Sequence, residues 1–144
     1  MKLLVLQGIP ASGKSTYAKQ WVSENPKIRV IVSRDAIRIM LGDSPLKAKD
    51  KLVDQIESNL VHMFLKQGYD VCLDATNLSD KKIQWCNELV TELSKENYSV
   101  DLEFKVFKVP LKDAIERDKN RSVKVGAMAI AFFYKKYNAI IGFK

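Results

Sequence analysis

Apolar runs alternate along this chain with segments in which apolar residues recur every three or four positions. The continuous runs predict strands buried on both faces of a sheet, and a run with strict alternation predicts a strand covered on one face and near an edge. The continuous runs span residues 3–7, 28–32 and 69–75. The alternating run spans 99–109, with Val100, Leu102, Phe104 and Val106 on one face.

The segments between these runs have the spacing of amphipathic helices. Ser33 and Ser79 are placed as N-caps of two of them, and the Asn25-Pro26 pair ends the first. In the longest helix we expect the buried stripe to be Leu52, Ile56, Leu60 and Met63 with Phe64. The predicted helices span residues 13–24, 34–41, 46–67, 79–97, 111–121 and 127–140.

Regular alternation of strand and helix predicts an α/β fold with a parallel sheet and helices on both of its faces. We expect four strands in the order 2-3-1-4 within a single domain that spans residues 1–144. Ligands bind to such sheets at the carboxyl ends of the strands, where the strand order switches. We therefore expect the functional site at the carboxyl ends of the first and third strands.

The charge, the apolar runs and the cysteines of the sequence indicate which partners and which cellular environment to expect. Lys and Arg number 24 against 17 Asp and Glu, a net charge of +7 that fits either a solvated basic surface or an anionic partner such as nucleic acid. No apolar run approaches the roughly 20 residues of a membrane helix, so no membrane association is expected. The apolar N-terminus runs directly into a glycine loop and predicts a strand, not a signal peptide. Cys72 and Cys86 suit reduced, buried thiols in a cytoplasmic protein.

A phosphate-binding pattern follows the first strand. Residues 8–15, GIPASGKS, fit G-x-x-x-x-G-K-[ST] between a strand and a helix. Backbone N–H groups there cradle phosphates, Lys14 reaches the β- and γ-phosphates, and Ser15 places its hydroxyl on Mg²⁺. We expect the ATP-binding set to be Gly8, Ala11, Ser12, Gly13, Lys14, Ser15 and Thr16. The pattern predicts nucleotide binding but not the reaction, because switches, motors and kinases share it.

Asp35 and Arg38 follow the second strand, three residues apart and on one face of the next helix. A kinase needs a carboxylate that orients the acceptor hydroxyl and takes its proton, and Asp35 is placed for that role. Arg38 would then hold a negative group of the acceptor, most naturally a phosphate. The alternative is structural: Asp35 favours the positive end of the helix dipole and Arg38 pairs with it.

Polar side chains also follow the third strand, in the stretch DATN. Asp74 occupies the position where P-loop enzymes commonly have a second acidic residue that supports Mg²⁺. Thr76 and Asn77 add a hydroxyl and an amide at the rim of the predicted site. The alternative is an ordinary turn before the Ser79 cap, since Asp, Thr and Asn favour turns.

A lid is predicted at about residues 112–126, where Arg117 and Arg121 are spaced to lie on one face of a helix. An arginine that closes over the γ-phosphoryl group stabilises the charge that develops during its transfer. Without other motifs, a solvated basic helix end, with Arg117 paired to Asp113 or Glu116, is the better explanation of both residues. Trp21 and Trp85 are interpreted as core residues or partly buried anchors.

Taken in order, GIPASGKST, SRDAIR, DATN and the late R-x-x-x-R resemble the kinase domain of the bacteriophage polynucleotide 5′-kinase family, from Met1 to about Tyr137. The resemblance implies ATP-dependent transfer of the γ-phosphate to the 5′-hydroxyl of DNA or RNA, in nucleic acid repair in the cytoplasm (of the host, for a viral protein). It implies that Lys14 and Ser15 hold the ATP phosphates and Mg²⁺, and that Asp35 is the general base. It also implies that Arg38 binds the 3′-phosphate of the acceptor, and that Arg121, with Arg117 beside it, contacts the donor phosphates.

The sequence departs from that family in two places. The viral enzyme reads Asp-Thr-Asn, whereas Asp74 here lies one position earlier, and a shift of one residue in a strand can turn its side chain away. No D-x-D-G-T motif is present, so we expect no phosphatase activity in this chain.

Two other functions are compatible with these motifs. One is a P-loop kinase that acts on a hydroxymethylated base, a small metabolite or a nucleotide sugar, and the other is a nucleotide-binding regulatory module without phosphotransfer. The alternating fourth strand also leaves room for a partner, including a second copy of the chain.

Overall fold

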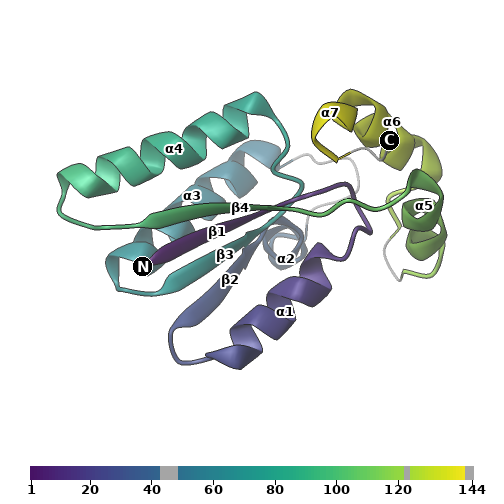
Figure 1. The fold of residues 1–144 in the computed structure, drawn as a ribbon. Helices are drawn as coiled ribbons and strands as arrows, with labels where there is room; N and C mark the ends of the chain where they lie inside the picture. Colours follow the sequence, from purple (N-terminus) through teal and green to yellow (C-terminus); the bar gives the residue numbers. More distant parts are fainter. Residues whose placement is uncertain (43–48, 122–123, 142–144) are drawn as a thin grey trace.

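Four parallel strands form the centre of the molecule (Figure 1). The computed structural model describes residues 1–42, 49–121 and 124–141. The strands lie in the order β2-β3-β1-β4, so the order predicted from the sequence is confirmed and β4 is an edge strand. Their bounds are β1 Lys2–Gln7, β2 Arg29–Ser33, β3 Asp70–Asp74 and β4 Asp101–Val106.

Helices connect the strands and cover both faces of the sheet. Both predicted serine caps are present: Ser33 Oγ accepts a hydrogen bond from the Ala36 N–H, and Ser79 Oγ accepts one from the Lys82 N–H. No helix in the described ranges is both long and apolar enough to cross a membrane. The helices are α1 Lys14–Glu24, α2 Arg34–Met40, α3 Asp50–Lys66, α4 Asp80–Lys95, α5 Leu111–Lys119, α6 Ala127–Lys136 and α7 Asn138–Ile141.

Alternate residues of β1 face two separate cores. Leu3 and Val5 pack with α2, α3 and α4, whereas Leu4 and Leu6 pack with α1 on the opposite face. All four side chains are at most 2% exposed. Burying each contributes about 1.5–3 kcal/mol, which holds β1, and the loop that follows it, rigidly in the centre of the sheet.

The last three helices lie beyond the carboxyl ends of the strands (Figure 1). They are attached there by a third cluster of buried side chains, in which Ala114 of α5 and Ile130 of α6 pack with Ile9 and Leu78. Ile9 belongs to the glycine loop after β1, and Leu78 belongs to the loop after β3. The same apolar contacts therefore fix the helical cap and both loops of the predicted site.

Two predictions about helices were wrong in detail. The buried stripe of α3 is Val53, Glu57, Val61 and Leu65, whereas Leu52 and Met63 are 43% and 45% exposed. The stripe is displaced by one position because α3 is covered by α2 as well as by the sheet, so Ile56, Leu60 and Phe64 lie at its partly buried margin. The predicted start of this helix at residues 46–48 lies outside the described residues.

The helix expected over residues 127–140 is divided into α6 and α7 at Tyr137. The Tyr137 backbone has φ −112°, outside the helical range, although its N–H still bonds to the Phe133 carbonyl. The Tyr137 ring stacks on Phe133 with the ring centroids 6.3 Å apart. Packing of this aromatic pair into the cap cluster accompanies the break, and no proline or glycine marks it in the sequence.

Candidate active site

The loop between β1 and α1 has two positions, Gly8 and Gly13, at which a side chain would be strained. The Gly8 N–H donates to the Thr76 carbonyl at 3.1 Å, and a Cβ atom on Gly8 would lie 2.6 Å from Ser12 Oγ. Gly13 has φ 99°, a conformation that side chains disfavour, and Ala11 adopts φ 63°. The strand–loop–helix context predicted for this motif is present.

Lys14 lies inside this loop, with 8% of the residue exposed. Its Nζ donates to the Gly8 carbonyl at 3.0 Å, the Ile9 carbonyl at 2.7 Å and Ser12 Oγ at 3.2 Å. The three acceptors hold the ammonium group against the glycine loop. Ser15 and Thr16 follow in the first turn of α1, and both are exposed.

The charges around Lys14 show which predicted residues share one site. Burial lowers the pKa of Lys14 to about 8, while the Asp74 and Asp35 carboxylates oppose the shift and Arg121 adds to it. These groups come from α1, from the end of β3, from α2 and from the segment after α5. The structure therefore brings Asp35 and Arg121 within electrostatic range of both Lys14 and Asp74, as the sequence predicted.

Asp74, the last residue of β3, faces the glycine loop. Its Oδ2 accepts a hydrogen bond from Ser15 Oγ at 2.8 Å, and it is 8% exposed. Burial raises the pKa of Asp74, whereas the Ser15 hydrogen bond and the nearby Lys14 charge oppose the rise. The one-residue displacement relative to the viral pattern thus leaves Asp74 directed at Ser15, beside Ser33 of β2 in the sheet register.

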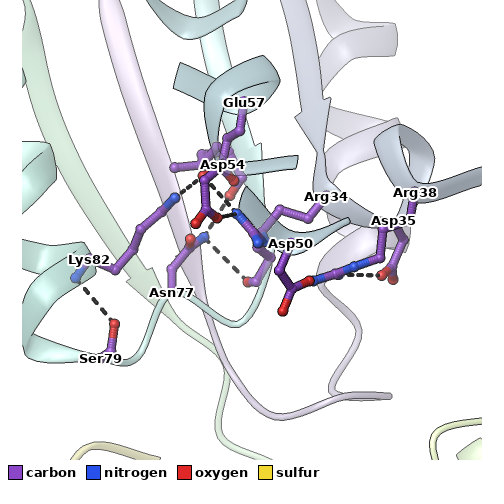
Figure 2. Close-up of polar contacts among 11 residues, drawn as sticks. Arg34, Asp35, Arg38, Asp50, Asp54, Glu57, Asn77, Ser79 and Lys82 are labelled. Carbon is purple, nitrogen blue, oxygen red and sulfur yellow. Dashed lines mark hydrogen bonds and ion pairs between the residues drawn. The ribbon is translucent and has the colours of Figure 1, made fainter. Parts of the chain in front are cut away.

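Asp35 and Arg38 lie on α2 as expected, and a third residue joins them (Figure 2). The Asp35 side chain is 76% exposed, and its Oδ1 is 3.7 Å from Arg38 Nη1. Arg38 Nη2 donates to Asp50 Oδ1 at 3.0 Å. Asp50 begins α3 and was not identified from the sequence, where it stands in an unremarkable stretch, LKAKD. Only the packing of α2 against α3 places its carboxylate on Arg38.

The Asn77 side chain forms hydrogen bonds with backbone carbonyl groups at the ends of β1 and β3. It is 4% exposed, and its Nδ2 donates to the Leu6, Leu73 and Ala75 carbonyls at 2.8, 3.1 and 3.3 Å. These bonds tie the ends of β1 and β3 together below the site. Thr76 is half-buried. The substrate-binding roles expected for Thr76 and Asn77 stay predictions, and the geometry adds a structural role for Asn77.

The two lid arginines differ in position. Helix α5 ends at Lys119, so Arg121 lies beyond it; its side chain is 37% exposed and its Nη1 is 3.7 Å from Asp118 Oδ1. The positive charge of Arg121 lowers the pKa of both Lys14 and Asp74. Arg117 is exposed on α5 and is not among the charges that shift the pKa of either residue. The structure thus brings Arg121, but not Arg117, to the site; residues 122–123 of the predicted lid lie outside the described ranges.

Asp118 is a further residue of the lid that the sequence analysis did not identify. It is 3% exposed, and its carboxylate accepts hydrogen bonds from the Val125 and Gly126 N–H groups, each at 2.9 Å. Burial acts to raise the pKa of Asp118, but the two N–H donors, together with the Arg121 and Lys124 charges, outweigh it and the pKa is lowered. The carboxylate thereby connects the end of α5 to the beginning of α6 next to Arg121.

An ion-pair network centred on the buried Glu57 lies next to Asp35 and Arg38 (Figure 2). Arg34 Nη1 is 2.6 Å from Asp54 Oδ1 and 3.2 Å from Glu57 Oε1. Glu57, only 2% exposed, also accepts a hydrogen bond from Lys82 Nζ. The network joins α2, α3 and α4 next to Asp35, and no motif in the sequence marked it.

Known proteins are similar to this chain in sequence and architecture. Residues 3–131 match the family described as AAA domain. The chain is 29% identical, over 160 aligned positions, to the "Putative bifunctional polynucleotide kinase/RNA ligase" of Autographa californica nuclear polyhedrosis virus, covering 99% of this chain and 22% of the viral protein. It is 30% identical to a chain of the Pnkp1/Rnl/Hen1 RNA repair complex, with a TM-score of 0.80 over 96% of this chain and 44% of the other.

A more distant structure supports the fold alone. The Mycobacterium tuberculosis APS kinase CysC, solved with AMPPNP and APS, superposes with a TM-score of 0.61 at 18% identity over 81% of this chain and 68% of the other. The chain spans less than half the length of the polynucleotide kinase relatives that it matches. The similarity to polynucleotide kinases that the motifs indicated is confirmed, as is the P-loop kinase fold. The chain belongs to the AAA domain family of P-loop nucleotide-binding domains.

Proposed function

We propose that this chain is an ATP- and Mg²⁺-dependent polynucleotide kinase that phosphorylates the 5′-hydroxyl end of DNA or RNA. One observation carries the proposal: Lys14, Asp35, Asp74 and Arg121 interact electrostatically at the carboxyl ends of β1 and β3, with Arg38 beside Asp35. The names of the relatives support a nucleic acid acceptor and a role in repair.

The donor side follows from the loop geometry. The N–H groups at the beginning of α1, which have no partner within the helix, can bind an anion, and Lys14 supplies a positive charge for the β- and γ-phosphates. The hydroxyl of Ser15 and the carboxylate of Asp74 are the hard oxygen ligands that Mg²⁺ takes together with substrate phosphates, so this hydrogen-bonded pair fits the ion. When bound, Mg²⁺ supplies charge neutralisation at the phosphate oxygens.

The acceptor side uses α2. Asp35 is largely exposed, so a 5′-hydroxyl can reach its carboxylate. As the oxygen of this hydroxyl bonds to the γ-phosphorus and the bond from that phosphorus to the β,γ-bridging oxygen breaks, Asp35 takes the hydroxyl proton and ADP leaves. Arg38 holds the 3′-phosphate of the same nucleotide through its fork of N–H donors. Arg121 stabilises the negative charge that develops on the transferred group.

The test compares phosphate transfer with nucleotide binding. Wild-type protein with γ-labelled ATP and Mg²⁺ should label a single strand that has a free 5′-hydroxyl and not the same strand already 5′-phosphorylated. Asp35→Asn should lower kcat by about 100-fold or more, the contribution of a general base, and should retain ATP affinity. Asp101→Asn, an exposed carboxylate at the amino end of β4, is the matched control and should behave as wild type.

Two results would contradict the proposal. Label on neither strand, with ATP still bound, would exclude a 5′-end kinase and point to a different acceptor. Full activity in Asp35→Asn would remove Asp35 as the base, whatever the acceptor is.

A further inference from the structure

A buried carboxylate that the proposed chemistry does not use lies in the helical cap. Asp118 is 3% exposed and belongs to the last turn of α5. Its Oδ1 accepts a hydrogen bond from the Val125 N–H, and its Oδ2 accepts one from the Gly126 N–H, each at 2.9 Å. The Asp118 backbone carbonyl also accepts a hydrogen bond from the Arg121 N–H at 3.1 Å. One residue therefore fixes both ends of the short segment that carries Arg121.

The face of α5 on which Asp118 lies is itself packed against the candidate active site. Ala114 precedes Asp118 by four residues, so both lie on the buried face of this helix. Ala114 packs with Ile9 of the glycine loop and with Ile130 of α6. Helices α5 and α6 contact each other beyond the carboxyl ends of the strands (Figure 1). The hydrogen bonds of Asp118 therefore connect the Arg121 segment to the same cluster that fixes the glycine loop.

An ion pair with Asp118 also restrains the Arg121 side chain. Arg121 Nη1 lies 3.7 Å from Asp118 Oδ1, and the Arg121 side chain is 37% exposed. Its positive charge lowers the pKa of both Lys14 and Asp74, so the guanidinium lies within electrostatic range of the phosphate-binding loop. A long side chain loses rotamer freedom when it is fixed, and a group that is already in its working position avoids this loss during the reaction. The Asp118 carboxylate is thus placed to keep the guanidinium near Lys14.

We propose that Asp118 is a positioning residue for phosphate transfer, which fixes the segment after α5 so that Arg121 reaches the γ-phosphate. The inference rests on the proposed kinase function and adds to it a residue that acts through Arg121. The glycine loop and Lys14 bind ATP in the ground state, whereas Arg121 acts on the charge that develops during transfer. Loss of the Asp118 carboxylate should therefore lower kcat and leave KM for ATP nearly unchanged. A purely structural role would lower the amount of folded protein and not the turnover of each folded molecule.

The test is a double-variant cycle on Asp118 and Arg121, with kcat expressed per bound molecule of a fluorescent ATP analogue so that unfolded protein is not counted. With saturating ATP, Mg²⁺ and a 5′-hydroxyl oligonucleotide, Arg121→Gln should lower kcat by about 100-fold or more, the effect of removing one donor to a developing charge. Asp118→Asn should lower kcat by at least about tenfold, because misplacing a catalytic group by about 1 Å costs up to about 100-fold. In protein that already carries Arg121→Gln, Asp118→Asn should lower kcat by less than about twofold. Asp113→Asn, an exposed carboxylate of the same helix, is the matched control and should behave as wild type.

Asp118→Glu keeps the charge but moves the carboxylate by one carbon, and it replaces Asp118→Asn in the cycle if that variant does not fold. Equal losses of kcat from Asp118→Asn with and without Arg121→Gln would overturn the inference, because Asp118 would then act on the cap as a whole. An Asp118→Asn variant with the kcat of wild type would overturn it too. Both results leave the kinase assignment intact, whereas transfer to no oligonucleotide by wild-type protein would overturn the proposed function, and the inference with it.

Discussion

Glu57 is the buried centre of the ion-pair network that joins three helices next to the candidate active site. Its Oε1 accepts hydrogen bonds from Arg34 Nη1 and Lys82 Nζ, and the residue is 2% exposed. Glu57→Gln keeps the shape of the side chain and removes its charge. Lys82 would then lose its carboxylate partner, whereas Arg34 would keep Asp54 at 2.6 Å.

The expected loss of stability depends on the fact that Lys82 loses its carboxylate partner whereas Arg34 keeps one. Removing one partner of a fully buried ion pair costs about 3–5 kcal/mol. Arg34 retains a second carboxylate, and the Lys82 side chain is 18% exposed, so water offsets part of the loss. We therefore expect Glu57→Gln to lower the free energy of unfolding by about 2–3 kcal/mol. At roughly 3 °C for each kcal/mol, Tm should fall by about 6–9 °C.

Urea unfolding followed by circular dichroism would measure this for Glu57→Gln, Lys82→Met and the double variant. If the pair interacts as the geometry indicates, the double variant should lose at least about 1 kcal/mol less than the two single losses combined. Glu88→Gln, on the exposed face of α4, is the control and should change stability by less than about 0.5 kcal/mol. A loss of that small size in Glu57→Gln, or strict additivity of the two changes, would refute the reasoning.

Three further predictions concern the lid, the cysteines and the glycine loop. Asp118→Asn should cost about 1–3 kcal/mol at neutral pH, because an amide cannot accept both backbone N–H bonds. The lowered pKa of Asp118 means that its contribution is lost on protonation, so the difference between variant and wild type in urea unfolding should shrink as pH falls below 3.8; a constant difference would argue against this role. Burial raises the pKa of Cys72 to about 12 and of Cys86 to about 11, so a thiol reagent at mildly alkaline pH should label both only after unfolding, and fast labelling of the folded protein would contradict this. Gly8→Ala places a Cβ atom 2.6 Å from Ser12 Oγ and should lower stability by about 1–3 kcal/mol and weaken binding of a fluorescent ATP analogue; unchanged affinity and stability would show that the loop tolerates the methyl group.

The elements and the donor loop were predictable because their signals are local. A continuous apolar run predicts a buried strand wherever it occurs, and Ser33 and Ser79 cap helices through bonds to residues three positions away. The glycine loop is a strand–loop–helix unit whose anion site depends on its own backbone. The chemical candidates at the strand ends were predictable as well, since the carboxyl ends of parallel strands meet at one edge of the sheet.

The sequence by itself therefore determined the strands, most helices, the phosphate-binding loop and the site edge. Tertiary structure decided which further charges join the predicted residues and how all of these side chains contact one another. Asp74 is 59 positions from Ser15, and Glu57 is 25 positions from Lys82, so each contact depends on how separate elements pack. The turn of Asp74 toward Ser15 and the Asp50 carboxylate on Arg38 have no local sequence signal. They arise because burial of the two cores fixes the helices against the sheet, and only then do distant side chains share a site.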